Sequence, residues 1–251
     1  MELLDNLRRL PPPSHALAGA VYPPTALLDN YSRGQYGLVD IKSPPVHASV
    51  LVPLALDPSS GELTATLTLR TRRLKRHSGE VALPGGKRDQ ADGGSDRVTA
   101  LREASEEIGL GESDVVEVLA ELERPVAVGG LIMGVVVAVV RSNFHAAPNL
   151  GEVEAVFTMP LRAFLEGGER YAYRSEDLPP TAATAEAASQ LQRPMRMHWF
   201  TQREPGGAEY LVWGLTSSIL IHVAELVYGE PTAFEKDGPL MQPQQPLRPK
   251  L

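Results

Sequence analysis

The sequence predicts an α+β domain or a layered α/β/α sandwich, and three observations lead to this fold class. Apolar stretches with the alternation or β-branching of strands are interspersed with stretches of helical periodicity. The order of these elements lacks the regular strand–helix–strand alternation of a parallel sheet. The 251 residues, of which 43% are apolar and 22% charged, suit one globular domain with additions.

Four stretches have the pattern of strands. Residues 48–56 and 131–140 are almost continuously apolar, which indicates buried strands. The second run has ten residues and many β-branched side chains, so it is too short to cross a bilayer. Pro53 places the first run near a sheet edge or a bulge, because proline cannot donate to a strand ladder. Residues 63–71 and 115–122 complete this set of strands.

The clearest helix is predicted for residues 96–108. Ser95 or Asp96 can cap its first turn, and Gly109 follows as a stop signal. A shorter helix is predicted for residues 160–167, with a proline in its first turn. Near the C-terminus, "MHWF" and "EYLVWG" predict a hairpin, and "TSSILIHVAELVYG" predicts a final amphipathic helix that ends at a glycine.

The chain divides into an N-terminal extension (1–45), one domain (46–230) and a C-terminal tail (231–251). The extension and the tail are rich in proline, which favours extended connectors. Residues 175–194 are rich in Ala, Thr and Pro and poor in large apolar side chains, so we expect a mobile insertion or long loop there.

Composition limits the classes of partner. A net charge of -7 argues against a general nucleic-acid binder, whose surface would be basic. The absence of cysteine rules out disulfides, thiolate metal sites and cysteine nucleophiles. The first residues lack the uninterrupted apolar core of a signal peptide. We therefore expect a cytoplasmic protein with no nucleic-acid partner and no membrane partner.

Three acids on the predicted helix need an explanation. Glu103, Glu106 and Glu107 are spaced so that they share one helix face, and like charges at that spacing destabilise a helix. A solvated acidic face is the ordinary explanation of such a cluster. A divalent cation is the alternative, because Mg²⁺ takes carboxylate oxygens and bridges to substrate phosphates.

Two neighbouring segments favour the cation. The loop "PGGKRDQAD" (84–92) precedes the helix, and its glycines let the backbone approach a metal or a phosphate closely. Between Arg70 and His77 the chain has five Lys/Arg side chains and no acid, which suits phosphate groups or, alternatively, a solvated face. Glycine loop, acidic helix and basic strip together indicate hydrolysis of a phosphoanhydride.

The stretch from Gly85 to Leu110 resembles the Nudix box, G-x5-E-x7-R-E-U-x-E-E-x-G-U with U apolar. Its second half matches at Arg102, Glu103, Ala104, Glu106, Glu107, Gly109 and Leu110. Its first half departs from the pattern, because Gly94 stands eight residues before Arg102, where the first glutamate is expected. Asp92 is the best substitute for that glutamate.

The longer loop and the flanking sequence resemble one Nudix subgroup, the coenzyme A pyrophosphatases. The resemblance rests on "LTLRTRRLKRHSGEVALPGG" (67–86), "NLGEVEAVFTMPL" (149–161) and "VWGLTSSIL" (212–220). It implies a Nudix-like α/β/α sandwich with a mixed central sheet. It also implies hydrolysis of the coenzyme A diphosphate to 3′,5′-ADP and 4′-phosphopantetheine, with Mg²⁺ or Mn²⁺ as cofactor.

The same resemblance implies a role for each candidate residue. Metal ligands would be Gly86 (through its carbonyl), Glu103, Glu106 and Glu107, and Arg102 would orient a carboxylate. The proton of the attacking water would go to Glu152 or to Glu107, and both stay open. The substrate phosphates would meet Arg70, Arg72, Arg73, Lys75, Arg76 and His77, although His77 also suits a structural role within its loop.

Two other functions stay open at the level of sequence. One is a Nudix hydrolase for another nucleoside diphosphate, such as ADP-ribose or a dinucleotide. The other is a non-catalytic Nudix module that binds a nucleotide, which the missing box glutamate at Gly94 keeps under consideration. The expected partner is a small nucleotide resembling coenzyme A, and a homodimer is the candidate assembly.

Overall fold

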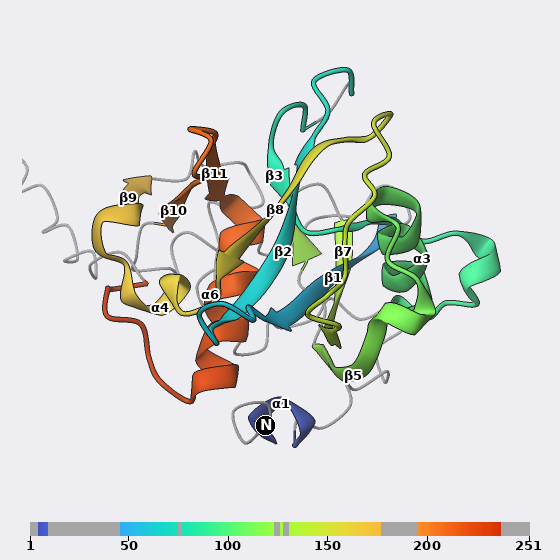
Figure 1. Ribbon diagram of the computed structural model, residues 1–251, viewed down its shortest axis with the longest axis horizontal. Helices are drawn as coiled ribbons and strands as arrows, with labels where there is room; N and C mark the ends of the chain where they lie inside the picture. Colours follow the sequence, from blue (N-terminus) through green and yellow to red (C-terminus); the bar gives the residue numbers. More distant parts are fainter. Residues whose placement is uncertain are drawn as a thin grey trace, which may run out of the picture.

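The computed structural model describes residues 5–9, 46–74, 77–122, 126–127, 131–176 and 195–236. Its helices and strands (Figure 1) are α1 (Asp5–Arg8), β1 (Val46–Leu56), β2 (Leu63–Arg70), β3 (Val81–Ala82), β4 (Gly85–Lys87), α3 (Asp96–Ile108), β5 (Val115–Leu122), β6 (Val126–Ala127), β7 (Leu131–Val140), β8 (Val153–Pro160), α4 (Ala163–Glu166), β9 (Tyr171–Glu176), β10 (Met195–Arg203), β11 (Glu209–Trp213) and α6 (Gly214–Tyr228).

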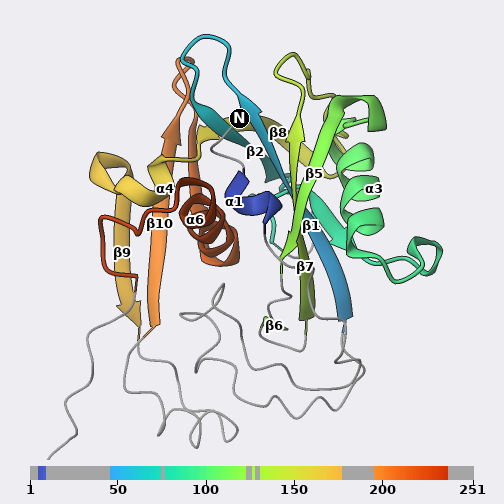
Figure 2. The ribbon, with the colours of Figure 1, turned by 90° about the horizontal axis from the view of Figure 1, so that it is seen from below.

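The central sheet is mixed. Its strands follow the order β3-β2-β1-β7-β5, while β4 pairs with β1, β6 with β7 and β8 with β2. β1 and β7 run parallel, with Val46 opposite Leu131 and Leu54 opposite Val139. The other pairs are antiparallel. Helix α3 covers one face of this sheet and α6 covers the other (Figure 2), so the predicted α/β/α sandwich with a mixed sheet is confirmed.

A second sheet adds a layer that the sequence did not predict. Strands β11, β10 and β9 form a three-stranded antiparallel sheet on the far side of α6, so that this helix lies between the two sheets (Figure 2). The predicted hairpin is confirmed as β10 and β11, where Phe200 pairs with Val212 and both are fully buried. The strand β9 was not predicted.

Two apolar cores explain the long apolar runs. Because successive residues of a strand point to opposite faces, Leu51 in β1 packs toward Ala104 of α3, whereas Val52 and Leu54 pack with Leu220 of α6. In β7, alternate valines divide between the same two cores. Both strands are therefore buried on both faces, as the near-continuous apolar sequence indicates.

Two local expectations were wrong, and both concern proline. Pro53 lies in β1 at the centre of the sheet, at the point where β1 stops pairing with β4 and begins to pair with β2. Two residues earlier, Leu51 donates its N–H to Pro84 on that same side at 2.8 Å, so the missing donor of Pro53 falls where the partner strand changes. Pro160 ends β8 instead of opening a helix, and the helical turn is α4.

The described ends of the chain are tied to the domain. Arg8 of α1 pairs with Glu117 of β5 at 2.7 Å, and Phe234 stacks on Tyr171 with ring centroids 4.1 Å apart. The proposed division at residues 45 and 230 stays a prediction, and residues 177–194, most of the predicted insertion, lie outside the described residues. No described helix is long and apolar enough to cross a membrane.

Candidate active site

The glycine loop and the acidic helix meet where β4 runs along α3. The helix spans Asp96–Ile108, as predicted, because Ser95 caps it by accepting the N–H of Val98 at 3.3 Å. It ends at Gly109, whose φ of 71° lies in the left-handed region that glycine adopts without strain. Strand β4 pairs with β1, so the loop that carries Gly86 is attached to the centre of the sheet.

Glu107 is the most buried of the three helix acids, with 3% of its side chain exposed. Its Oε2 accepts the N–H of Gly85 at 3.0 Å, and its Oε1 lies 3.6 Å from Nη1 of Arg70. Burial raises the pKa of Glu107 to about 7, although the Gly85 N–H and the Arg70 charge act in the opposite direction. The neighbouring charges of Glu103 and Glu152 raise this pKa further.

Glu103 lies against the backbone of Gly86. A Cβ at Gly86 would stand 2.4 Å from Oε2 of Glu103, so only glycine lets the strand approach this carboxylate so closely. The Glu103 side chain is 14% exposed and receives a 3.0 Å ion pair from Arg102. Burial raises the pKa of Glu103, Arg102 lowers it, and the charges of Glu106 and Glu152 raise it.

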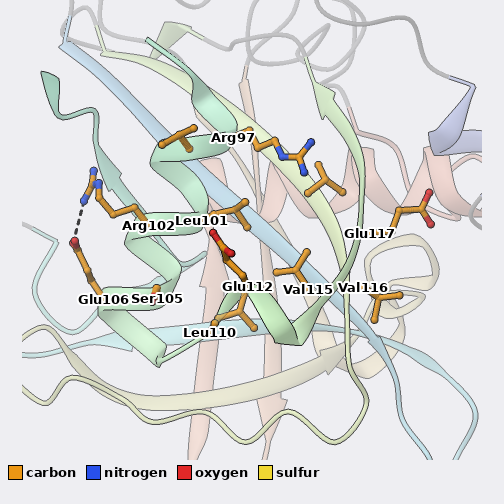
Figure 3. A pocket seen from close by; sticks show the side chains of 13 residues that line it. Arg97, Leu101, Arg102, Ser105, Glu106, Leu110, Glu112, Val115, Val116 and Glu117 are labelled. Atoms are coloured by element: carbon orange, nitrogen blue, oxygen red, sulfur yellow. Dashed lines mark hydrogen bonds and ion pairs between the residues drawn. The ribbon is translucent and has the colours of Figure 1, made fainter. Parts of the chain in front are cut away.

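Glu106 differs from the other two acids. Its side chain is 57% exposed and pairs with Arg102 at 3.0 Å. Figure 3 shows this ion pair at one side of a groove of about 770 Å³ between α3 and the start of β5. The predicted common face is therefore divided: Glu103 and Glu107 are turned toward β4, and Glu106 lies beside the groove.

Asp92 supplies the acid that the sequence motif requires and that Gly94, at the expected position, lacks. It is 3% exposed and lies in a 3₁₀ turn formed by Gln90–Asp92. Its carboxylate accepts hydrogen bonds from Nε and Nη2 of Arg102 at 2.9 and 3.0 Å, and from Thr99 at 2.9 Å. Arg102 holds the pKa of Asp92 far below its usual range. Five residues separate Gly86 from Asp92, as in the first part of the motif, so counting forward from Gly86 instead of eight back from Arg102 also leads to this acid.

Glu152 is brought to the same region by the loop before β8. Asn149 donates its N–H to the carbonyl of Glu107 at 2.9 Å, and the N–H of Glu152 returns to the Asn149 carbonyl at 2.9 Å. The carbonyl of Glu152 accepts the N–H of Thr71 at 2.8 Å. The Glu152 side chain is exposed, and its charge acts on both Glu103 and Glu107.

The basic strip is only partly at the acids. Arg70 ends β2 and contacts Glu107, whereas Arg72, Arg73 and His77 are exposed on the loop between β2 and β3 (Figure 1). His77 has a φ of 53°, and its Nδ1 lies 2.9 Å from a carboxylate oxygen of Glu80, which agrees with a structural role in the loop. Lys75 and Arg76 lie outside the described residues.

The donor set suits a hard divalent cation. Carboxylates and a backbone carbonyl are the oxygen ligands of Mg²⁺ and Mn²⁺, and the cradle between Gly86 and Glu103 is one that a Cβ would fill. Burial raises the pKa of Glu103 and of Glu107, and a bound cation would act in the opposite direction by favouring the charged carboxylates. Among the described residues no three acids or histidines form a group that could hold a metal ion.

Comparison with protein families matches residues 45–178 to the NUDIX domain, which is more than half of the chain. The chain belongs to the Nudix family. This confirms the resemblance inferred from the box. Helix α3 carries the helical part of the Nudix box. Five residues separate Gly86 from Asp92, as they separate the first glycine from the first acid of the box.

Three Nudix relatives are similar to this chain over most of its length. Nudix hydrolase 15, mitochondrial, of Arabidopsis thaliana is 39% identical over 197 residues, or 78% of this chain and 63% of that protein. Nudix hydrolase 22, chloroplastic, of the same plant is 37% identical over 213 residues, or 82% and 63%. Peroxisomal coenzyme A diphosphatase NUDT7 of Mus musculus is 38% identical over 190 residues, or 75% and 73%. The chain thus spans about 63% of the length of the two plant relatives.

Several contacts of the Nudix site could not be found from the sequence. The N–H of Gly85 on Glu107 and the carbonyl of Lys87, which accepts from Arg102 at 3.1 Å, are backbone groups that any residue type would supply. Asp96, considered as a helix cap, instead turns inward and pairs with Arg88. Nothing in the sequence pattern distinguishes these contacts from ordinary loop and helix positions.

Proposed function

We propose that this protein is a Mg²⁺-dependent coenzyme A diphosphatase. The observation that carries the proposal is the junction of Glu103 and Glu107 with the Gly85–Gly86 backbone, directly beside the guanidinium of Arg70. A half-buried carboxylate and a buried one suit a divalent cation, and the adjacent arginine suits the phosphate oxygens of the substrate. The similarity to a relative named as a coenzyme A diphosphatase supports this substrate.

The cation would be held by Glu103, Glu107 and the carbonyl of Gly86, with Glu106 joining when it leaves Arg102. When bound, it would acidify the attacking water and offset negative charge on the diphosphate. Arg102 holds the helix in place through Asp92 and the carbonyl of Lys87, so it is a positioning residue for Glu103 and Glu106.

Arg70 is the best placed of the basic residues to bind a phosphate. Its Nη1 already faces Glu107, and its Nε is buried without a hydrogen-bond partner among the described residues. A phosphate oxygen would provide that partner. Arg72, Arg73 and His77, together with Lys75 and Arg76, would provide positive charge for the 3′-phosphate of coenzyme A from the loop between β2 and β3.

Glu152 is the better candidate for the base. Glu107 already serves as a proposed ligand of the cation, whereas Glu152 is exposed and its charge acts on both Glu103 and Glu107. Water would attack one phosphorus while its proton passes to Glu152, and the bridging P–O bond would break with its electron pair leaving on the other phosphate. The products are 3′,5′-ADP and 4′-phosphopantetheine.

The first experiment is chromatography of products after incubation with coenzyme A and Mg²⁺. We expect both products from the wild type and none with chelator. Glu107→Gln should lower kcat by about 100-fold or more, since even groups that only support metal ligands contribute 10- to 100-fold. Glu152→Gln should lower kcat while Mn²⁺ binding is kept, and Glu112→Gln, in the turn after α3, is the control that should change neither.

Each alternative has its own result. Turnover of ADP-ribose equal to or faster than that of coenzyme A would move the assignment to another nucleoside diphosphate. Ligand binding without any turnover, unchanged by Glu106→Gln, would indicate a non-catalytic module. The presence of Asp92 at the box position supports the enzyme over the module. A cytoplasmic location and a homodimer belong to the same proposal, and fractionation and light scattering test them.

A further inference from the structure

Strand β4 and helix α3 are joined by contacts in antiparallel order. The N–H of Gly85 binds Glu107 at 3.0 Å, the carbonyl of Lys87 binds Arg102 at 3.1 Å, and Arg88, just after the strand, pairs with Asp96. Residues later in the strand thus contact residues nearer the N-terminus of the helix. Gly86 against Glu103 falls in the middle of this series, where the proposed metal donors meet.

The last contact of the series is buried and lies outside the proposed site. Asp96 is 4% exposed, and its Oδ1 accepts both the Arg88 guanidinium and the hydroxyl of Ser49, the latter at 2.8 Å. The Ser49 side chain is fully buried, and Ser49 is the residue of β1 that pairs with Gly86. The carboxylate of Asp96 is therefore connected to β4 in two ways, directly through Arg88 and indirectly through Ser49 of β1.

The sheet is shaped to receive this carboxylate. Gly134 of β7 lies directly beneath it, where a Cβ would stand 2.3 Å from Cγ of Asp96. The N–H of Arg88 also binds the carbonyl of His47 at 2.9 Å, which extends the pairing of β1 with β4 by one residue. The cluster of Ser49, Arg88 and Asp96 thus fastens the end of β4 and the start of α3 to the same two strands.

We propose that Arg88 and Asp96 are positioning residues that set the metal affinity of the site. They hold β4 against α3, so that the Gly86 backbone and the Glu103 carboxylate stay next to each other. Without Arg88, the strand keeps its pairing to β1 but loses its attachment to the helix at this end. This inference rests on the proposed function for the identity of the ligands, and on the contacts above for the role of the cluster.

The test is Arg88→Met, which removes the guanidinium but keeps most of the side-chain volume. Calorimetric titration with Mn²⁺ alone should show a dissociation constant raised by about 10- to 100-fold, as for other groups that support metal ligands. At saturating Mn²⁺ the kcat for coenzyme A should stay within about threefold of the wild type, because the loaded site is the same. Arg88→Lys, which keeps the charge, should lie between the two.

The matched control is Arg162→Met. Arg162 also pairs with an acid, Glu230 at 3.0 Å, but it does so beside α4, away from β4 and α3. Its loss should leave Mn²⁺ affinity unchanged. Adding Asp96→Asn to Arg88→Met should weaken Mn²⁺ binding less than the sum of the single changes, because both remove one contact.

Three results would overturn the inference. The first is a dissociation constant for Mn²⁺ in folded Arg88→Met and Arg88→Lys that equals that of the wild type. The second is a lowered melting temperature of Arg88→Met with unchanged Mn²⁺ affinity. The third is no binding of Mn²⁺ to the wild type, with or without 3′,5′-ADP. The proposed function fails separately. If the wild type binds Mn²⁺ but does not cleave coenzyme A, weaker Mn²⁺ binding in Arg88→Met still supports the positioning role.

Discussion

Arg102 is the residue that pairs with two of the three acids of the helix. Its guanidinium contacts Asp92, Glu103 and Glu106 and also reaches the carbonyl of Lys87. The like-charge repulsion expected from the sequence is therefore offset within the helix itself. Planar guanidinium groups suit this task because they present five donors in fixed directions.

Replacement of Asp92 tests this arrangement. Asp92→Asn leaves Arg102 its contacts with Glu103, Glu106 and Lys87 but removes the buried negative charge that it faces, so the free energy of unfolding should fall by about 3 kcal/mol, the lower end for a broken buried pair. Urea unfolding at pH 7 measures the change. Asp57→Asn, at an exposed aspartate that binds Ser59, is the control and should change little. An Asp92→Asn protein as stable as the control would contradict the role assigned to this pair.

The pH dependence of this difference has a definite sign. Hydrogen bonds from Arg102 hold the pKa of Asp92 well below its usual range. A carboxyl group with a lowered pKa stabilises the folded state above its unfolded pKa, about 3.9, and loses this contribution as the pH falls. The wild type and Asp92→Asn should therefore differ most at neutral pH and converge below about pH 4. A difference that grows on acidification would contradict this account.

Some residues of the site can be predicted from the sequence, whereas their contacts cannot. The sequence indicates Glu103, Glu106 and Glu107 through their helical spacing and Arg102 through the resemblance to the Nudix box. Their partners do not, because Gly85 and Lys87 reach α3 through the pairing of β4 with β1, and Glu152 is brought near by the loop before β8. The division of the three acids between a buried and an exposed direction likewise depends on where β4 lies.

At the scale of elements, β4 and α3 together carry the proposed site. Two adjacent glycines in β4 are needed for different reasons. A Cβ at Gly85 would meet backbone atoms of β1, with the Ser49 carbonyl at 2.4 Å. A Cβ at Gly86 would meet only the end of the Glu103 side chain, which can rotate away. The first glycine is thus required for packing, and the second for the geometry of the proposed site.

The two alanine variants should separate these tasks. Gly85→Ala should destabilise the fold by about 1–3 kcal/mol, as overpacked positions do, because backbone atoms must move. Gly86→Ala should retain the melting temperature but lower Mg²⁺-dependent activity by about 10- to 100-fold through displacement of Glu103. Thermal unfolding and kinetic assays on the same preparations measure both. Equal effects of the two variants on stability would show that the distinction is wrong.

Whole-molecule stability provides the test of the cation. A ligand that binds only the folded state raises its stability, and at ten times the dissociation constant the gain is about 1.4 kcal/mol. For a domain of this size, Mg²⁺ should then raise the melting temperature by about 3–6 °C, and chelator should reverse the rise. Glu103→Gln combined with Glu107→Gln should abolish it. A shift that survives in this double variant would place the cation elsewhere.

The layering of the molecule places the site on the face of the central sheet that α3 covers. Helix α6 is enclosed between the central sheet and the three-stranded sheet, and its buried residues contribute to the larger core. On the other face, α3 packs through alanines and Ile108, small or aliphatic side chains that bring the helix close to the sheet. This packing holds the backbone of α3 against the sheet to which β4 belongs.

The sequence by itself determined the elements with strong local signals: the helix Asp96–Ile108 with its cap and stop, the buried strands, the final helix and the acidic motif. These follow from periodicity, capping and side-chain direction, which act over a few residues. Only the tertiary structure decided the second sheet, the central place of Pro53 and the joining of β4 to α3. Pairing partners and burial depend on contacts between distant segments, and local sequence does not encode these.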